Sequence, residues 1–159
     1  MQELAIKDLT ENFFEAIGKE WMLVTSGSKE KFNTMTASWG GIGFLWNKAV
    51  AFIFIRPERY TYEFIEKNDM LTLSFLGSGN RSIYNICGSK SGRDTDKIKE
   101  SGLLPLTTPD GNVTFEQARL NAVNYTANCY LPSILSIKVC QTNGMEHREI
   151  SIKCMSWKS

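Results

Sequence analysis

The sequence predicts a mainly β protein, an antiparallel barrel with helices inserted singly between its strands. Six or seven segments have the apolar patterns of strands and are rich in Val, Ile, Phe and Thr. The helical segments do not alternate strictly with these strands, as they would in a doubly wound parallel sheet. No internal repeat is visible in the chain. Together these three observations favour an antiparallel barrel.

Local patterns justify the elements of the first half of the chain in order. Residues 8–20 predict a short helix, because Asp8 and Glu11 form a capping-box-like pair ahead of an apolar repeat. A second helix is expected at residues 61–68, after Pro57 has ended the strand before it. Apolar runs bounded by turn residues predict strands at residues 21–27, 32–41, 49–55 and 70–76.

The second half of the chain predicts fewer helices and a long strand pair. Residues 82–88 are compatible with a helical turn, and residues 91–102 predict a helix with Asp94 as N-cap and Gly102 just past its end. Residues 103–118 are rich in Pro and turn residues and predict an extended excursion. The last strands are expected in residues 119–131 and 133–157, with a hairpin turn at Asn143 and Gly144.

Length and charge narrow the class of protein. We expect residues 1–159 to form a single domain, since this length suffices for one hydrophobic core. The formal net charge is +1 without runs of like charge, which argues against nucleic acid or a membrane surface as partner. The apolar run 49–55 is too short to span a bilayer, and charges interrupt the N-terminal residues before a signal sequence could form. The sequence therefore predicts a cytoplasmic protein.

Cysteine and histidine patterns offer no metal site and no nucleophilic triad. No two of the four cysteines have CxxC spacing, which predicts reduced thiols; they are Cys87, Cys129, Cys140 and Cys154. The only histidine is His147, so mechanisms that need a buried histidine are not supported. Residues 77–82 resemble a dinucleotide-binding glycine motif, but Ser82 replaces its last glycine and no acidic strand end follows.

Residues 33–41 combine small polar side chains with an indole and two glycines. Thr36, Ala37 and Ser38 would let a flat heteroaromatic ring approach the strand, whose N–H and C=O groups could bond the ring. Trp39 could form a wall against that ring. The alternative interpretation is a barrel corner with a bulge.

Two further segments could bind a phosphate. Arg56 and Arg59 flank a strand-to-helix junction that also carries Thr61, and guanidinium groups suit a phosphate. The alternative is surface pairing of one arginine with Glu58 or Glu63. Residues 91–93 form a polar loop ahead of another helix, which could also be a plain helix cap. Together, the three segments describe a pocket for a phosphorylated planar cofactor, and FMN fits that description.

Residues 33–41, 56–61 and 85–97 also resemble, in order and spacing, the flavin reductase-like FMN-binding split-barrel family and its flavoredoxin-type branch. The resemblance extends over residues 22–102. It implies a Greek-key split β-barrel and a homodimer with FMN near the interface. Members transfer electrons between NAD(P)H or a protein donor and a flavin, ferric iron or a protein acceptor. It thus implies an FMN-dependent oxidoreductase, with NAD(P)H as a transient substrate and a redox protein as a further partner.

The resemblance also implies a role for individual residues. Those expected at the ring and ribityl chain are Thr36, Ala37, Ser38 and Trp39. Those expected at the phosphate are Arg56, Arg59, Tyr60 and Thr61. Those expected on the third side are Ser89, Ser91, Gly92, Asp94 and Lys97. Since the flavin ring would carry the chemistry, no catalytic side chain is predicted. Two alternatives are an electron carrier without direct NAD(P)H oxidation and a non-catalytic module that binds FMN or a haem-related group.

Overall fold

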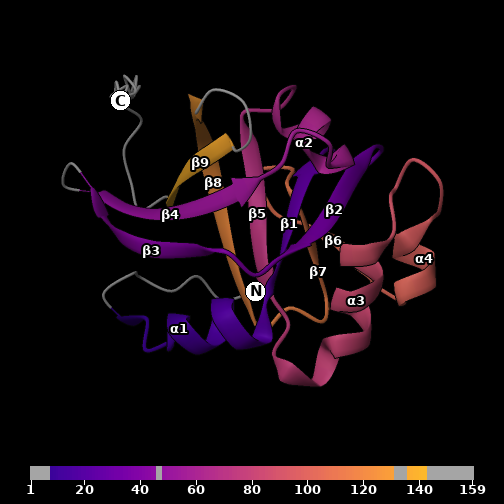
Figure 1. Cartoon of the computed structure of the whole chain (residues 1–159), viewed down its shortest axis with the longest axis horizontal. Helices are drawn as coiled ribbons and strands as arrows, with labels where there is room; N and C mark the ends of the chain where they lie inside the picture. Colours follow the sequence, from indigo (N-terminus) through magenta and orange to yellow (C-terminus); the bar gives the residue numbers. More distant parts are fainter. Residues whose placement is uncertain (1–7, 46–47, 131–135, 143–159) are drawn as a thin grey trace.

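The structure is a computed structural model that describes residues 8–45, 48–130 and 136–142. Seven antiparallel strands form one sheet in the order β2-β1-β5-β8-β9-β4-β3, and a second sheet pairs β6 with β7 (Figure 1). The strands of the large sheet are β1 (Met22–Gly27), β2 (Phe32–Ala37), β3 (Gly40–Leu45), β4 (Lys48–Ile55), β5 (Met70–Phe75), β8 (Leu120–Tyr130) and β9 (Ser136–Thr142). The small hairpin contains β6 (Pro105–Thr107) and β7 (Val113–Phe115). The predicted mainly β, antiparallel architecture is confirmed.

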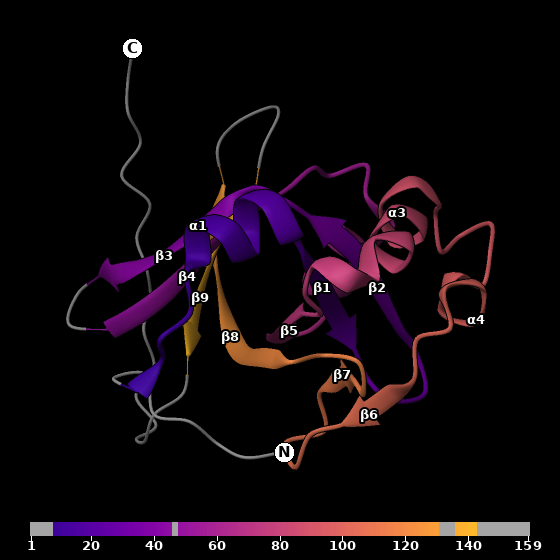
Figure 2. The ribbon, with the colours of Figure 1, turned by 90° about the horizontal axis from the view of Figure 1, so that it is seen from below.

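The large sheet curves so that its two edges approach each other (Figure 2). The edge strands β2 and β3 are joined directly by Ser38 and Trp39, and β2 also contacts β4. Within the described residues no ladder of hydrogen bonds joins β2 to β3. The barrel is therefore open between these edges.

The helices lie singly around the sheet. They are α1 (Phe13–Glu15), which continues as a π-helix at Ala16–Glu20, α2 (Tyr60–Ile65), a 3₁₀ turn at Ser78–Asn80, α3 (Arg81–Ser89) and α4 (Lys97–Ser101). Both α3 and α4 lie on the side of β1 and β2, away from β3 and β4 (Figure 2). None of the helices in the described ranges has the length and apolar character needed to cross a bilayer.

The core has two parts because β1 is buried on both faces. Met22 and Val24 contribute to the larger cluster inside the curved sheet, with residues of β4 and β5. Leu23 points to the opposite face and packs with Tyr84 and Phe115 under α3 and the small hairpin. A strand that is covered on both faces needs a continuous apolar run, which explains the run at 22–24.

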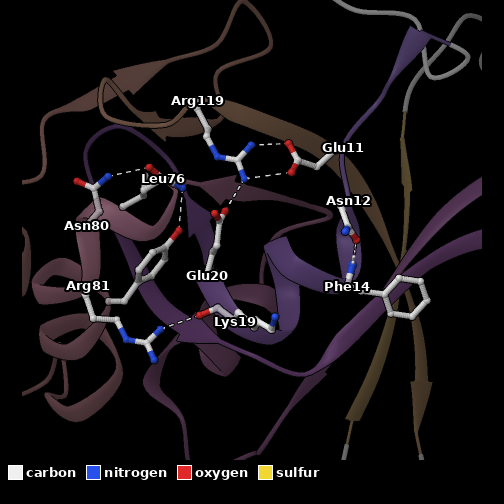
Figure 3. Close-up of polar contacts among 10 residues, drawn as sticks. Glu11, Asn12, Phe14, Lys19, Glu20, Leu76, Asn80, Arg81 and Arg119 are labelled. Carbon is white, nitrogen blue, oxygen red and sulfur yellow. Dashed lines mark hydrogen bonds and ion pairs between the residues drawn. The ribbon is translucent and has the colours of Figure 1, made fainter.

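An ion-pair cluster attaches the segment before α1 to the rest of the barrel. The Arg119 guanidinium pairs with both Glu11 and Glu20, which come from either end of the N-terminal helical segment (Figure 3). These contacts join residues about 100 positions apart in the sequence. The segment is thereby held across the lower end of the curved sheet.

Three local predictions were wrong. The first helix is capped by Asn12, whose side chain accepts from the N–H of Phe14, and not by a pair of Asp8 and Glu11. The N-cap of α4 is Asp96, whose side chain accepts from the N–H of Lys99, and not Asp94. Residues 32–41 form parts of two strands and not one. Gly102 does end α4 in the left-handed conformation, while the turn predicted at 143–144 lies outside the described residues.

Candidate functional site

An open cleft of about 190 Å³ lies between the end of β2 and the junction of β4 with α2. Its lining residues are Met35, Thr36, Ala37, Ser38, Trp39, Phe54, Arg56 and Arg59. The cleft thus joins two of the three segments that the sequence singled out. It lies where the edge strand β2 contacts β4.

The corner between β2 and β3 supplies one wall of the cleft. At Gly40, with φ +159°, an added Cβ would lie 2.4 Å from the carbonyl oxygen of Phe52, so only glycine lets β3 pair this closely with β4 here. The turn leaves the Trp39 side chain 61% exposed. The side chains of Ser38 and Trp39 make no hydrogen bond with any other described residue.

The opposite wall carries the two predicted arginines. The N–H of Arg59 donates to the carbonyl of Arg56 at 3.0 Å, and Pro57 sets φ for the turn between them. The turn places both side chains at the cleft. Nη1 of Arg59 donates to the carbonyl of Gly88 at 2.9 Å, whereas the Arg56 guanidinium has no hydrogen bond or ion pair with any described residue. Neither arginine pairs with Glu58 or Glu63, which removes the alternative interpretation.

Tyr60 and Thr61 are used in packing beside the cleft and are not part of its lining. The Thr61 hydroxyl accepts a hydrogen bond from Asn33 Nδ2 at 2.7 Å, and both residues are buried. The Tyr60 ring contacts Phe64 edge-on, with 5.1 Å between the ring centroids, and lies under the Arg93 guanidinium. These contacts fix the start of α2, which carries Arg59.

The third predicted segment lies beside the first two, but its residues do not line the cleft. Gly92 packs against Asn33, and the Ser91 hydroxyl accepts from the N–H of Arg93. Ser89 donates to the carbonyl of Asn85 in its own helix. Asp94 is exposed, and its side chain makes no hydrogen bond or ion pair in the described ranges.

Lys97 differs from the role expected for it, because its side chain is directed into the protein. It is 4% exposed, and its ammonium donates to the carbonyls of Cys87 and Lys90. Burial lowers the pKa of this ammonium and raises the pKa of the nearby Cys87 thiol. The residue belongs to the packing of α3 against α4 and not to the surface of the cleft.

Met35 and Phe54 also line the cleft, although the sequence patterns did not predict them there. Phe54 lies two positions before Arg56 in an extended chain, so the period of a strand places both on the same face. That spacing could have identified it. Among the described residues no group of three His, Cys, Asp or Glu side chains could hold a metal ion.

The family described as "Flavin reductase like domain" matches residues 14–127. Among curated protein sequences, none matches the chain.

Three of the solved structures similar to this chain illustrate the likeness. A flavoredoxin from Methanosarcina acetivorans has a TM-score of 0.69 and 20% identity to this chain. The match covers 79% of this chain and 66% of the flavoredoxin, so the chain spans just under two thirds of that protein. An FMN-binding protein from Thermus thermophilus with bound 1-cyclohex-2-enone has a TM-score of 0.70 and 19% identity, over 91% of this chain and 79% of that one. A protein from Shewanella frigidimarina described as a flavin reductase with a split barrel domain has a TM-score of 0.67 and 16% identity, over 83% and 69% of the two chains. These likenesses confirm the predicted split-barrel fold.

Proposed function

The chain belongs to the family of flavin reductase-like domains, and from that premise we propose that it is an FMN-binding oxidoreductase with its cofactor in the cleft described above. The observation that carries the proposal is the Arg56 guanidinium, which lines the cleft without a partner among the described residues. An arginine that lines a cleft and is not paired with a carboxylate is suited to bind an anion from outside the chain.

The donor set of the cleft fits the parts of FMN. Arg56 and Arg59 present two guanidinium groups from one turn to a dianionic phosphate. At the other wall the side-chain donors of Ser38 and Trp39 have no partner among the described residues, and the small Ala37 lets a flat ring come close to the backbone. When bound, the flavin supplies hydride and single-electron transfer. The protein binds and orients it, so no side chain is required as acid, base or nucleophile.

The absorption spectrum of the purified protein and an FMN titration test this proposal. We expect bands of oxidised flavin and saturable binding of added FMN. Arg56→Ala should weaken FMN binding tenfold or more, because a hydrogen bond to a charged group contributes about 1.5–3 kcal/mol. Lys67→Ala removes one exposed positive charge at the other end of α2 and serves as the control. Unchanged FMN affinity in the Arg56 variant, or a haem spectrum, would contradict the proposal.

The reaction partners are a separate part of the proposal. We expect the FMN-loaded protein to oxidise NAD(P)H and to reduce a flavin, a ferric complex or a redox protein. An assay of NAD(P)H oxidation checks this directly. Reduction by a ferredoxin-type donor without any NAD(P)H oxidation would identify an electron carrier instead.

We also propose that a second copy of the chain covers the face formed by β3. This edge strand exposes the apolar side chains of Ile42 and Phe44, the latter 72% exposed, next to Trp39 at the cleft. An exposed apolar edge strand favours association with another chain. A second copy at this strand would cover the open side of the cleft. Light scattering should give a dimer, and Phe44→Glu should dissociate it, whereas Leu104→Glu at the far hairpin should not. A monomeric wild-type protein would refute this part.

A further inference from the structure

The buried ammonium of Lys97 lies at the C-terminal end of α3. It donates to the carbonyls of Cys87 at 3.3 Å and Lys90 at 3.2 Å. The last carbonyls of a helix have no partner within it and lie at the negative end of the helix dipole. A buried ammonium is tolerated only where it is hydrogen-bonded, so Lys97 and this helix end satisfy each other.

The second half of α3 also contacts residues that line the cleft. The carbonyl of Gly88 accepts from Arg59, and the carbonyl of Tyr84 accepts from the Thr36 hydroxyl at 2.6 Å. A Cβ at Gly88 would lie 3.3 Å from the Cβ of Thr36, which shows how closely the helix packs on β2. The final turn of α3 is therefore fixed by Lys97 on its buried side and contacts both walls of the cleft on the other.

The Gly88 carbonyl is the only hydrogen-bond partner of the Arg59 side chain among the described residues. Arg59 is exposed, and a long exposed side chain loses much rotamer freedom when it is held in one position. The place of its guanidinium at the cleft thus depends on where the Gly88 carbonyl lies. That position depends in turn on the carbonyls on either side of it, which Lys97 holds.

We infer that Lys97 is a positioning residue for the cleft, which acts through the C-terminal turn of α3 on Arg59 and does not touch the ligand. The inference rests on the proposed binding of FMN. It places Lys97 behind the cleft and not in its lining. Its ammonium donates to backbone carbonyls, and the residue is absent from the lining of the cleft.

A double-mutant cycle with FMN titration tests this inference on the full chain. Lys97→Met should weaken FMN binding roughly tenfold in the wild-type background, within the range seen for residues of one hydrogen-bond network. In the Arg59→Ala background the same substitution should cost less than about twofold, because the guanidinium it positions is gone. Lys99→Met removes an exposed charge two residues further along α4 and should leave FMN affinity unchanged in both backgrounds. Urea unfolding of each variant establishes that affinity is measured on folded protein.

Gly88→Ala provides a second route to the same turn without a change of charge. Its methyl group would lie 3.3 Å from the Cβ of Thr36, so the helix end and β2 must shift slightly relative to each other. It should weaken FMN binding in the wild type and much less in the Arg59→Ala background, and it decides the question if Lys97→Met does not fold.

Each outcome has a defined meaning. Equal costs in both backgrounds, or no cost in either, would overturn the positioning role while leaving FMN binding intact. A wild-type protein that does not bind FMN would overturn the proposed function, and this inference with it.

Discussion

Gly92 packs against the buried, hydrogen-bonded side chain of Asn33, so Gly92→Ala should be costly. A Cβ at this position would lie 2.1 Å from Asn33 Oδ1 and 3.3 Å from Cδ1 of Tyr60. Asn33 is 5% exposed, and its Nδ2 is already bonded to the Thr61 hydroxyl at 2.7 Å. The amide therefore cannot rotate away from the new methyl group without breaking a buried hydrogen bond.

The two ways in which the structure could respond have similar costs. Pushing the chain apart around the new methyl group is overpacking, which costs about 1–3 kcal/mol. Rotating Asn33 leaves buried polar groups without partners, which also costs about 1–3 kcal/mol. We therefore expect Gly92→Ala to lower the free energy of unfolding by about 2 kcal/mol.

Urea unfolding followed by tryptophan fluorescence measures this loss, with the slope against urea as a check on two-state behaviour. Gly79→Ala is the matched control, since nothing lies within 4 Å of its added Cβ. In an Asn33→Ala background the cost of Gly92→Ala should fall below about 0.5 kcal/mol, because the clashing atom is absent. A cost that equals the Gly79 control, or one that persists without Asn33, would refute the reasoning.

Two further predictions concern Tyr84 in α3 and Trp21, whose ring lies edge-on to that of Tyr84. Burial raises the pKa of the Tyr84 phenol, so the folded state holds this proton more tightly than the unfolded chain does. The associated stability is fully present below the unfolded-state pKa of about 10 and is lost as the pH rises through the higher pKa of the folded state. Urea unfolding should be measured from about pH 8 to about pH 11. Over this range the free energy of unfolding should fall more steeply in the wild type than in Tyr84→Phe, and parallel curves would contradict this. Trp21 has a φ of +76° and a ψ of 173°, a conformation that only glycine adopts without strain. Trp21→Gly should therefore be at least as stable as Trp21→Ala, the reverse of the usual order; a less stable glycine variant would exclude strain at this residue.

Local patterns predicted most strands and both arginines of the cleft. The strands at 22–27 and 70–75 have apolar runs that are buried in the barrel, and Pro57 marks the turn that brings Arg56 and Arg59 together. These features depend on residues close in sequence, so the sequence alone was sufficient for them.

The errors arose where several residues compete for one role. Asp94 and Asp96 are both residue types that cap helices well. Burial of the Lys97 side chain fixes the first residue of α4, and the residue before it, Asp96, is therefore the N-cap. Similarly, residues 32–41 have one strand-like pattern, yet Gly40 approaches Phe52 of another strand and divides the segment. Neither choice can be read from neighbouring residues.

The sequence by itself determined the strand pattern, the antiparallel arrangement and the presence of two cations at one strand end, because each follows from local periodicity or turn chemistry. Only the tertiary structure decided which polar groups remain free to bind a ligand. Thr36 is bonded to Tyr84, which lies 48 residues away, and Arg59 to Gly88, which lies 29 residues away, while Arg56 has no partner among the described residues. The physical reason is that a hydrogen-bond donor is free or satisfied according to what the folded chain places beside it, which contacts distant in sequence determine.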